Sequence, residues 1–506
     1  YLSPQQAREE TPHPTDDVYG LGAVLFFMAT GAEPSLSPHA DALLERPLCL
    51  LNPALSPALA AVIARCLAPE RAQRFASMAE VTAALVALPD EAVTDVLPSE
   101  LPDEDGPNRA RSLARRLGDT LCRTAVSGPT PGSRFWKSRH SASHGAVAWD
   151  INTGSAGTLL ALAEIVSEFR GPTHAQTLAE GAEGLRSLPF PAPQALPGLY
   201  VGEAGIGASL LRAGQVLGDD RLIASASARG AWIAAQPFTS PDLFNGTAGR
   251  LRFHLWLGDL PSAVAAGEAI LESRETTPDG GCCWRIPDGY GGMSGVVSLG
   301  YAHGAAGIAD ALLDLYDATG DGRYCEAAAQ TARWLLSLAQ PCLGDSSGLA
   351  WPPGEGRALT SAFWCHGAAG IGKFFLRAGQ SGAFDGALDI AKRAARATAQ
   401  GTRWAGPTQC HGLTGNIEFL LDMYQATGEA AYLADARALG RLLEAFGSET
   451  PDGLAWPSES PLIFSPDFQV GYAGVAACFL RLSAPERLPH ILSVKAFTTA
   501  ERECAR

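Results

Sequence analysis

Seven copies of the pattern Gly-x-x-Gly, spread over residues 154–474, limit the possible folds of this chain more than any other feature of its sequence. Their first glycines are Gly154, Gly202, Gly246, Gly304, Gly367, Gly412 and Gly471. Successive copies lie 44 to 63 residues apart, and an apolar stretch such as TLLALAEIV or IADALLDLY follows each pair. Repeats of this length are typical of stacked helical units, which share one core because no unit buries its apolar face alone. We therefore predict a mainly α fold, an α/α toroid of seven helix pairs whose inner helices begin at one mouth of the ring.

Cysteine and histidine stand directly before the glycine pair in three consecutive repeats. Two residues before the first glycine are Cys365 in the fifth repeat and Cys410 in the sixth. One residue before it are His303, His366 and His411 in the fourth, fifth and sixth repeats. In a toroid these side chains gather at one mouth, and thiolate and imidazole groups suit Zn²⁺, at about 2.3 Å to sulfur and 2.0–2.1 Å to nitrogen. Two cysteines and one histidine leave a fourth tetrahedral position open, which is typical of a catalytic zinc site.

Together, WCHG, the second CHG and the seven glycine pairs resemble the LanC family, the cyclases of lanthipeptide biosynthesis. The resemblance implies that Cys365, Cys410 and His411 bind Zn²⁺. It also implies that His303 is the acid/base and that Asp242, four residues before the third glycine pair, takes part in the reaction.

Two positions depart from that family pattern. Ser361 stands where an arginine often precedes the fifth-repeat cysteine by four residues, and His366 stands where a tyrosine often follows it. For His366 the sequence favours a structural role. The adjacent Cys282 and Cys283 have no partner motif near them in the sequence, so we expect them to pack in a loop.

Residues 1–88 resemble the C-terminal lobe of a Ser/Thr protein kinase. YLSPQ is similar to the end of an activation segment, with Gln5 where the family usually has Glu. Asp17 in DVYGLG matches the buried Asp that begins the central helix of that lobe, and Arg74 matches the Arg near its end. The Gly-rich loop, the phosphate-binding Lys, the HRD loop and the DFG Asp are missing from the sequence. We expect this segment to be the tail of a kinase domain that does not phosphorylate on its own; an unrelated helical bundle is the alternative.

The composition of residues 89–108 indicates a linker, since it has seven carboxylates, four prolines and no Lys or Arg. We expect the LanC-like domain to span residues 109–490 and a C-terminal tail to follow over residues 491–506. The chain begins with Tyr1 and not Met, so we expect a fragment or processed product whose upstream lyase and kinase parts are missing.

A kinase-like segment ahead of a LanC-like domain with metal ligands resembles a class IV lanthipeptide synthetase, which joins lyase, kinase and cyclase in one chain. Class III enzymes share this layout but lack the zinc ligands. The resemblance implies addition of Cys thiols to dehydroalanine or dehydrobutyrine in a leader-bearing precursor peptide, forming (methyl)lanthionine thioether rings. Zn²⁺ would turn the thiol into a thiolate, and His303 would supply the proton at the α-carbon. Asp242 would orient His303 or assist substrate deprotonation.

Each of these residues also has a plainer interpretation. His303 could be a packed histidine at a helix cap, Asp242 an ordinary N-cap residue, and the cysteines small buried hydrophobic residues. For the whole domain, two alternatives stay open: a catalytically idle LanC-like module that binds peptide or scaffolds the kinase, and another α/α-toroid enzyme such as a glycosidase. A glycosidase requires paired carboxylates at the mouth, where we expect a single one, Asp242.

The overall composition limits the classes of binding partner and the cellular compartment that we expect. With 38 basic and 53 acidic residues the formal charge is −15, which argues against nucleic acid and anionic membranes as partners. The 11 cysteines are an odd number spread over a long chain, as in reduced cytosolic proteins. The most apolar helix candidate, residues 23–30, is too short to cross a bilayer, so we expect a cytoplasmic protein.

Overall fold

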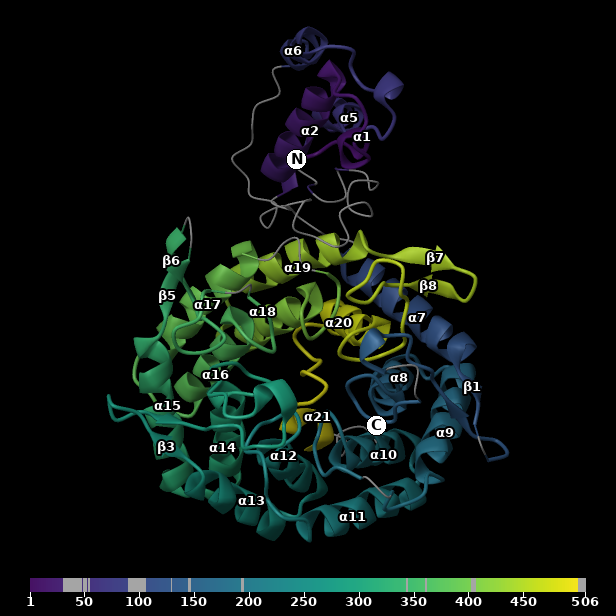
Figure 1. Ribbon diagram of the computed structural model, residues 1–506. Helices are drawn as coiled ribbons and strands as arrows, with labels where there is room; N and C mark the ends of the chain where they lie inside the picture. Colours follow the sequence, from purple (N-terminus) through teal and green to yellow (C-terminus); the bar gives the residue numbers. More distant parts are fainter. Residues whose placement is uncertain are drawn as a thin grey trace.

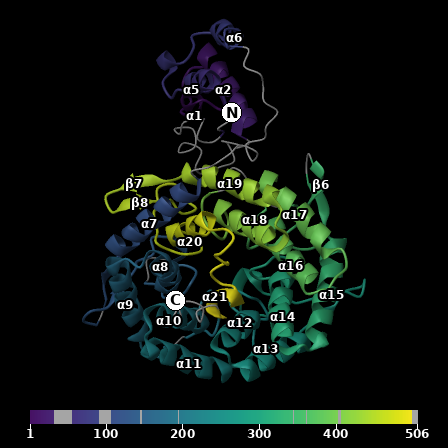
Figure 2. The same ribbon diagram turned by 180° about the vertical axis from the view of Figure 1, so that it is seen from behind.

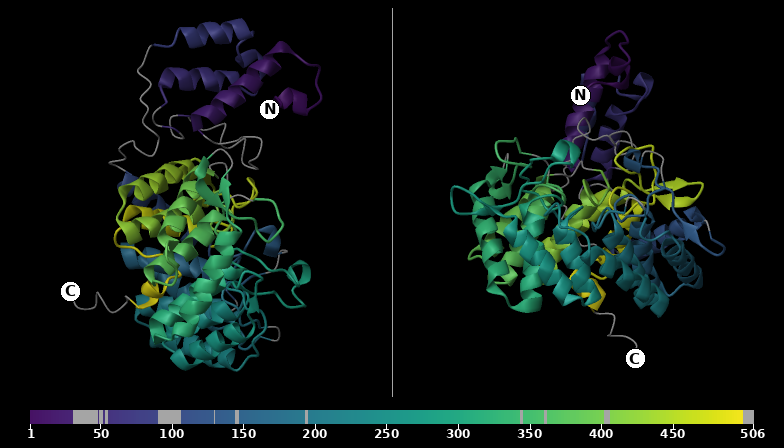
Figure 3. Two further views of the ribbon diagram at one scale, coloured as in Figure 1. Left: turned by 90° about the vertical axis from the view of Figure 1, so that its left-hand side faces the viewer. Right: turned by 60° about the horizontal axis from the view of Figure 1, so that its bottom comes forward.

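The computed structural model describes residues 1–30, 48, 52, 55–89, 106–128, 130–143, 147–192, 195–342, 345–359, 362–401 and 406–498. Most of the predicted acidic linker, Ser361 and the end of the predicted tail lie outside these residues. The described chain is mainly helical, and two layers of helices form a ring around a shared core (Figure 1). The predicted mainly α fold, an α/α toroid, is therefore confirmed. A smaller group of helices from the first 89 residues stands beside the ring (Figure 3).

Seven inner helices begin at the seven glycine pairs. They are α8 (Ser155–Phe169), α10 (Glu203–Leu217), α12 (Thr247–Leu257), α14 (Ala305–Thr319), α16 (Ala368–Gln380), α18 (Leu413–Thr427) and α20 (Tyr472–Ser483). The first glycine of each pair is the N-cap residue. A Cβ on the second glycine would overlap the carbonyl oxygen six residues earlier, for example that of Tyr301 at Gly307 and that of Trp364 at Gly370. Glycine is required there because the preceding loop folds back against the first turn of the helix.

Six outer helices follow the first six inner helices in turn. They are α9 (Pro172–Arg186), α11 (Asp220–Ala234), α13 (Leu260–Glu272), α15 (Gly322–Ser337), α17 (Ala387–Gly401) and α19 (Ala430–Glu444). The connections are short because several inner helices end at a left-handed glycine, as α14 does at Gly320 (φ 71°). The side chain of Asp321 then caps α15 by accepting a hydrogen bond from the amide of Arg323.

The ring closes between the two ends of the domain. Each inner helix contacts the next, and α20 contacts α8. The outer place beside α20 belongs to α7 (Gly106–Thr124), which precedes the first repeat in the sequence (Figure 2). Leu117 and Leu121 of α7 are fully buried, whereas Arg115 and Arg116 are exposed. The seventh helix pair is therefore assembled from the first and last helices of the ring.

A hairpin of two short antiparallel strands follows four of the outer helices. The pairs are β1 (Val126–Ser127) with β2 (Arg134–Phe135), β3 (Glu275–Thr276) with β4 (Cys282–Cys283), β5 (Gln340–Cys342) with β6 (Asp345–Ala350), and β7 (Ser448–Thr450) with β8 (Gly453–Ala455). Each hairpin leads to a buried tryptophan: Trp136, Trp284, Trp351 and Trp456. The indole N–H of each donates to a carbonyl in the last turns of the preceding outer helix. Cys282 and Cys283 are thus buried strand residues of one such hairpin.

The last described helix, α21 (Val494–Thr498), covers the end of the ring opposite the glycine pairs. The ring of Phe497 stacks on Trp256, near the C-terminal end of α12, with centroids 4.3 Å apart. The carbonyl of Phe497 accepts a hydrogen bond from Gln215, near the C-terminal end of α10. Figure 1 shows α21 inside the ring. Access to the middle of the toroid is therefore from the mouth where the inner helices begin.

The N-terminal helices are α1 (Pro4–Ala7), α2 (Pro14–Thr30), α5 (Pro57–Cys66) and α6 (Met78–Val86). The guanidinium of buried Arg74 donates to Gln5, 2.6 Å away, so the two residues of the kinase-like pattern meet. The prediction for Asp17 was wrong, because Asp17 is exposed and the buried carboxylate is that of Asp16. Asp16 turns inward because it accepts hydrogen bonds from Ser3 and from the amide of the residue before the helix. No helix in the described part is both long and apolar enough for a bilayer crossing.

Candidate functional site

The residues two places before the seven glycine pairs form a closed belt of backbone hydrogen bonds. In chain order they are Asn152, Tyr200, Phe244, Ala302, Cys365, Cys410 and Gln469. The amide of each donates to the carbonyl of its counterpart in the next repeat, and the seventh donates to the first, at 2.9 to 3.4 Å. Cys365 and Cys410 are neighbours in this belt, joined by a 3.4 Å bond. Equivalent positions in the repeats therefore bring the two cysteines together.

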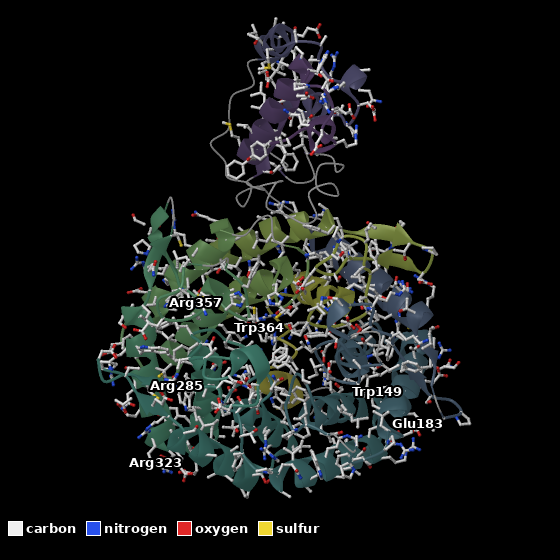
Figure 4. All side chains as sticks on the ribbon, in the orientation of Figure 1. Trp149, Glu183, Arg285, Arg323, Arg357 and Trp364 are labelled. Atoms are coloured by element: carbon white, nitrogen blue, oxygen red, sulfur yellow. The ribbon has the colours of Figure 1, made fainter. Side chains whose placement is uncertain are left out.

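A cavity of about 490 Å³ opens at this mouth of the ring. The residues with ionisable side chains in its lining are His140, His303, Arg357, Cys365, His366, Cys410, His411 and Glu459. In Figure 4, Trp364, the residue before Cys365, lies toward the centre of the ring, and Arg357 lies farther out on the same side. Four of the five predicted site residues line this one cavity, and the fifth, Asp242, lies directly behind His303.

Sulfur and imidazole groups are in contact on one side of the cavity. The sulfur of Cys410 lies 3.7 Å from Nε2 of His411, and the sulfur of Cys365 lies 3.0 Å from Nδ1 of His366. The ligand atoms of Cys365, His366 and His411 all lie within 4.8 Å of one another. Both cysteines are buried, whereas 40% of the His411 side chain is exposed to the cavity side. The cluster is therefore a buried pair of sulfurs with imidazoles at its open edge.

The pKa values of the two thiols shift in opposite directions because the thiols share hydrogen bonds. Burial disfavours a Cys365 thiolate, but hydrogen bonds from Cys410, His366 and His411 outweigh it and hold the pKa of Cys365 well below its usual value. The hydrogen bond to Cys365, together with burial, raises the pKa of Cys410. Burial opposes charge on His411, yet hydrogen bonds to Cys365 and Glu459 raise its pKa to about 10.

This donor set fits a zinc ion. A cysteine thiol and an imidazolium each carry a proton on the atom that would bind a metal. A divalent cation replaces such protons when it binds, because its ligands must be deprotonated. Thiolate and imidazole are the ligands that Zn²⁺ prefers in proteins. The cluster can therefore exchange its protons for Zn²⁺ with the residues that are already in contact.

A carboxylate orients His411 from behind. Oε1 of Glu459 lies 2.6 Å from Nδ1 of His411, and Oε2 lies 3.4 Å from Nε2 of His140. Hydrogen bonds from His140 and His411 hold the pKa of Glu459 well below its usual range. Because Nδ1 of His411 donates to the carboxylate, Nε2, which faces Cys410, is the nitrogen left to bind a metal once its proton is released. Carboxylate partners of this kind fix the tautomer and ring orientation of metal-binding histidines.

A second histidine–carboxylate pair lies in the same cavity. Nδ1 of His303 lies 2.9 Å from Oδ2 of Asp242, whose side chain is 1% exposed. The other carboxylate oxygen of Asp242 accepts from the amide of Asn245, 2.8 Å away. Asp242 therefore caps its own loop and holds His303 at the same time. The ring of His303 is fixed further by Phe244, whose centroid is 4.8 Å away.

Three residues that line the cavity were not predicted from the sequence: His140, Arg357 and Glu459. They lie in segments between the helices, outside the positions that the glycine pairs keep in register, so spacing gives no signal for them. The expectation of a single carboxylate at the mouth was wrong, because Glu459 also lines the cavity. Both carboxylates are engaged by histidines, however, and neither stands free for acid–base catalysis on a sugar.

Comparison with known proteins gives a family, a solved structure and a curated relative. Residues 145–493 match the model of the family described as lanthionine synthetase C-like protein. The solved structure of nisin cyclase superposes with a TM-score of 0.54 and 17% sequence identity, covering 69% of this chain and 93% of that one. At this identity the likeness shows the fold, which is that of an α/α toroid.

The chain also has a curated relative among the protein kinases. Serine/threonine-protein kinase PknB of Mycolicibacterium smegmatis is 28% identical over 238 residues, which cover 42% of this chain and 37% of that protein. The chain thus spans little more than a third of the length of this relative.

Proposed function

The chain belongs to the lanthionine synthetase C-like family, and we propose that its ring domain is a zinc-dependent lanthipeptide cyclase. The family match, the fold shared with nisin cyclase and the kinase homology together support the identification with a class IV lanthipeptide synthetase. The finer proposal concerns the metal, the residues and the substrate.

One observation carries the proposal: two cysteines and His411 converge in a cavity that also holds a carboxylate-bound histidine. We assign Cys365, Cys410 and His411 to the metal, and His303 with Asp242 to proton transfer. The assignment is supported by the grouping of Cys365 with His411, by the contact of Cys410 with His411 and by the Glu459 carboxylate behind His411. Histidines that served only for packing would have no need of carboxylate partners beside an open cavity.

The chemistry of the cavity then follows from these groups. When bound, Zn²⁺ lowers the pKa of a coordinated thiol from about 8.5, so that the thiol is a thiolate at neutral pH. His303 has Nδ1 engaged by Asp242, so Nε2 is the nitrogen that takes up and delivers a proton. Asp242 stabilises the protonated imidazole by accepting from Nδ1, in the manner of other histidine–carboxylate pairs.

The proposed reaction is an addition, with no oxidation and no leaving group. A peptide thiol gives its proton to Nε2 of His303, and its sulfur forms a bond to the β-carbon of a dehydroamino acid. The double-bond electrons move onto the neighbouring carbonyl as an enolate. His303 returns a proton to the α-carbon. Proton transfer by a placed histidine is usually worth about 10²–10⁴ in rate. The product is a lanthionine or methyllanthionine ring.

We propose a leader-bearing precursor peptide as the substrate. Dehydroalanine and dehydrobutyrine are Ser and Thr residues that have lost water, so a kinase and a phosphate lyase can produce them upstream. The Gln5–Arg74 contact in the N-terminal helices supports the kinase-like origin of that segment. Kinase and lyase activities, and the leader as a recognition element, are proposals for the longer synthetase.

The test is turnover of a peptide that already contains one dehydroalanine and one free Cys. Ring formation leaves the mass unchanged but protects the Cys from alkylation, so the fraction without the alkyl group measures cyclisation. A cyclase raises this fraction faster than the reaction without protein. An idle peptide-binding module would bind the peptide and leave the uncatalysed rate unchanged.

A further inference from the structure

His366 lies in the same cavity and has no part in the scheme above. Its Nδ1 atom lies 3.0 Å from the sulfur of Cys365. Together with Cys365 and His411 it forms a group whose ligand atoms could hold one metal ion. Cys410 hydrogen-bonds to the same Cys365 sulfur and contacts His411. One sulfur and two imidazoles therefore form a compact group, and the sulfur of Cys410 adjoins it through His411.

The spacing of these atoms agrees with a single tetrahedral ion. With bonds of about 2.3 Å to sulfur and about 2.05 Å to nitrogen, a sulfur and a nitrogen ligand of one tetrahedral zinc stand roughly 3.6 Å apart. The two observed sulfur–nitrogen separations, 3.0 Å from Cys365 to His366 and 3.7 Å from Cys410 to His411, lie on either side of that value. The separation of His366 from Cys365 is thus compatible with both residues binding one ion after a shift of about half an ångström.

Neighbouring groups fix His366 in this place. The ring of Phe363 meets both imidazoles at right angles, with its centroid 5.9 Å from those of His366 and His411. The amide of Phe363 donates to the carbonyl of His366. From the fourth repeat, Gly300 lies so close that a Cβ there would come within 2.9 Å of the Cα of His366. The loop therefore presents the imidazole to Cys365 as a built feature.

We propose that His366 is a fourth protein ligand, so that Cys365, Cys410, His411 and His366 form a Cys₂His₂ site. This inference rests on the proposed function, because it takes a metal at the cluster as given. Four protein ligands leave no free position, so one must move away before a substrate thiol can take its place. His411 is anchored by Glu459, whereas within the described structure the ring nitrogens of His366 hydrogen-bond only to Cys365. His366 is therefore the ligand that leaves.

Zinc X-ray absorption spectroscopy of the purified chain tests this directly. For the wild type without substrate we expect two sulfurs at about 2.3 Å and two imidazole nitrogens at about 2.0–2.1 Å. In His366→Ala one imidazole should be replaced by a water oxygen, and zinc affinity should fall by more than the roughly 10–100-fold typical of an outer partner. His303→Ala is the matched control, since it removes a histidine from the same cavity and should leave both readings unchanged.

The possible outcomes separate the two proposals. A wild-type spectrum with two sulfurs, one imidazole and an oxygen contradicts ligation by His366 and leaves the zinc cyclase standing. Wild-type protein that binds no zinc contradicts the proposed function itself. Because the wild-type spectrum alone decides the ligand count, a His366→Ala variant that fails to fold does not affect the test.

Discussion

Oε1 of Glu459 accepts a hydrogen bond from Nδ1 of His411 over 2.6 Å, and this contact directs Nε2 of the same ring toward the sulfur of Cys410. The carboxylate comes from the segment between β8 and α20, so the seventh repeat orients a proposed ligand of the sixth. The orientation of His411 is thus set by a residue outside the Cys-His-Gly motif.

Substitution of Glu459 by Gln should weaken zinc binding without removing a ligand. The amide keeps the shape of the side chain but loses the charge that favours the Nδ1–H tautomer, and such changes typically cost about 10–100-fold in metal affinity. Competition with a chromophoric chelator measures the effect. Glu449→Gln, an exposed carboxylate in the nearby strand β7, is the control and should bind zinc like the wild type. Equal affinities for the wild type and Glu459→Gln would refute the orienting role.

The wild-type chain should hold one Zn²⁺, and Cys410→Ala should lose it. Cys410 is a buried sulfur in contact with two other proposed ligands, so its removal leaves too few donors. Metal analysis by mass spectrometry after purification without chelator gives the stoichiometry. Cys325→Ala, on the outer helix α15, should keep its zinc. A wild type with well under half an equivalent would argue against a metal at this cluster.

The variant His303→Ala should still bind zinc but should cyclise the peptide more slowly. His303 contacts Asp242 and Phe244 but none of the proposed ligands in the described structure, so we expect full metal content and cyclisation slower by about 10²–10⁴-fold. Asp242→Asn should fall between this variant and the wild type, because the ring remains but its carboxylate is lost. Cyclisation by His303→Ala at the wild-type rate would mean that His303 has only a structural role. Loss of zinc from this variant would mean that the ligand assignment is wrong.

The free energy of unfolding should fall as the pH rises, because the buried side chain of Asp467 resists ionisation. Burial raises its pKa from 3.8 to about 7, although Ser138 and Ser465 donate hydrogen bonds to it. Between these values the unfolded chain releases a proton that the folded chain keeps, so stability falls as pH rises from about 4 to 7 and stays reduced above. The loss is a few kcal/mol at about 1.4 kcal/mol per unit.

Asp467→Asn removes this penalty. After metal has been removed with a chelator, the melting temperature of the variant should be higher than that of the wild type at pH 8. Near pH 4 the two melting temperatures should be equal. Asp288→Asn, at an exposed loop position, should follow the wild type at both values. The same melting difference for Asp467→Asn at both pH values would mean that Asp467 does not titrate in this window.

The toroid and the cysteine–histidine cluster could be predicted because both follow the register of the repeats. Cys365 and Cys410 occupy equivalent, neighbouring positions of the hydrogen-bonded belt, which the glycine pairs mark in the sequence. Asp242 was harder to interpret, since Asp150 and Asp467 stand at the same distance before their own glycine pairs. Only the structure shows that Asp242 meets a histidine of the next repeat.

Other features depend on packing between distant segments and leave no local pattern. Glu459 and His140 meet although 319 positions separate them, and α7 closes the ring beside α20 from the opposite end of the domain. The error at Asp17 has a local cause, because two adjacent aspartates begin α2 and the sequence does not show which one turns inward. The site residues and domain boundaries remain predictions.

The most direct test of the account is a zinc titration of the cyclisation rate. Metal is removed from the chain with a chelator, the chelator is dialysed away, and Zn²⁺ is added stepwise in the presence of a pre-dehydrated peptide. Protection of the peptide Cys from alkylation measures the rate. A reaction without protein gives the uncatalysed rate, which is the floor. We predict a rate at the floor without metal, a linear rise, and a plateau at one equivalent, with Cys410→Ala staying at the floor throughout. A stripped wild type that cyclises at full rate, or a rate that stays at the floor at every zinc level, would contradict a zinc-dependent cyclase.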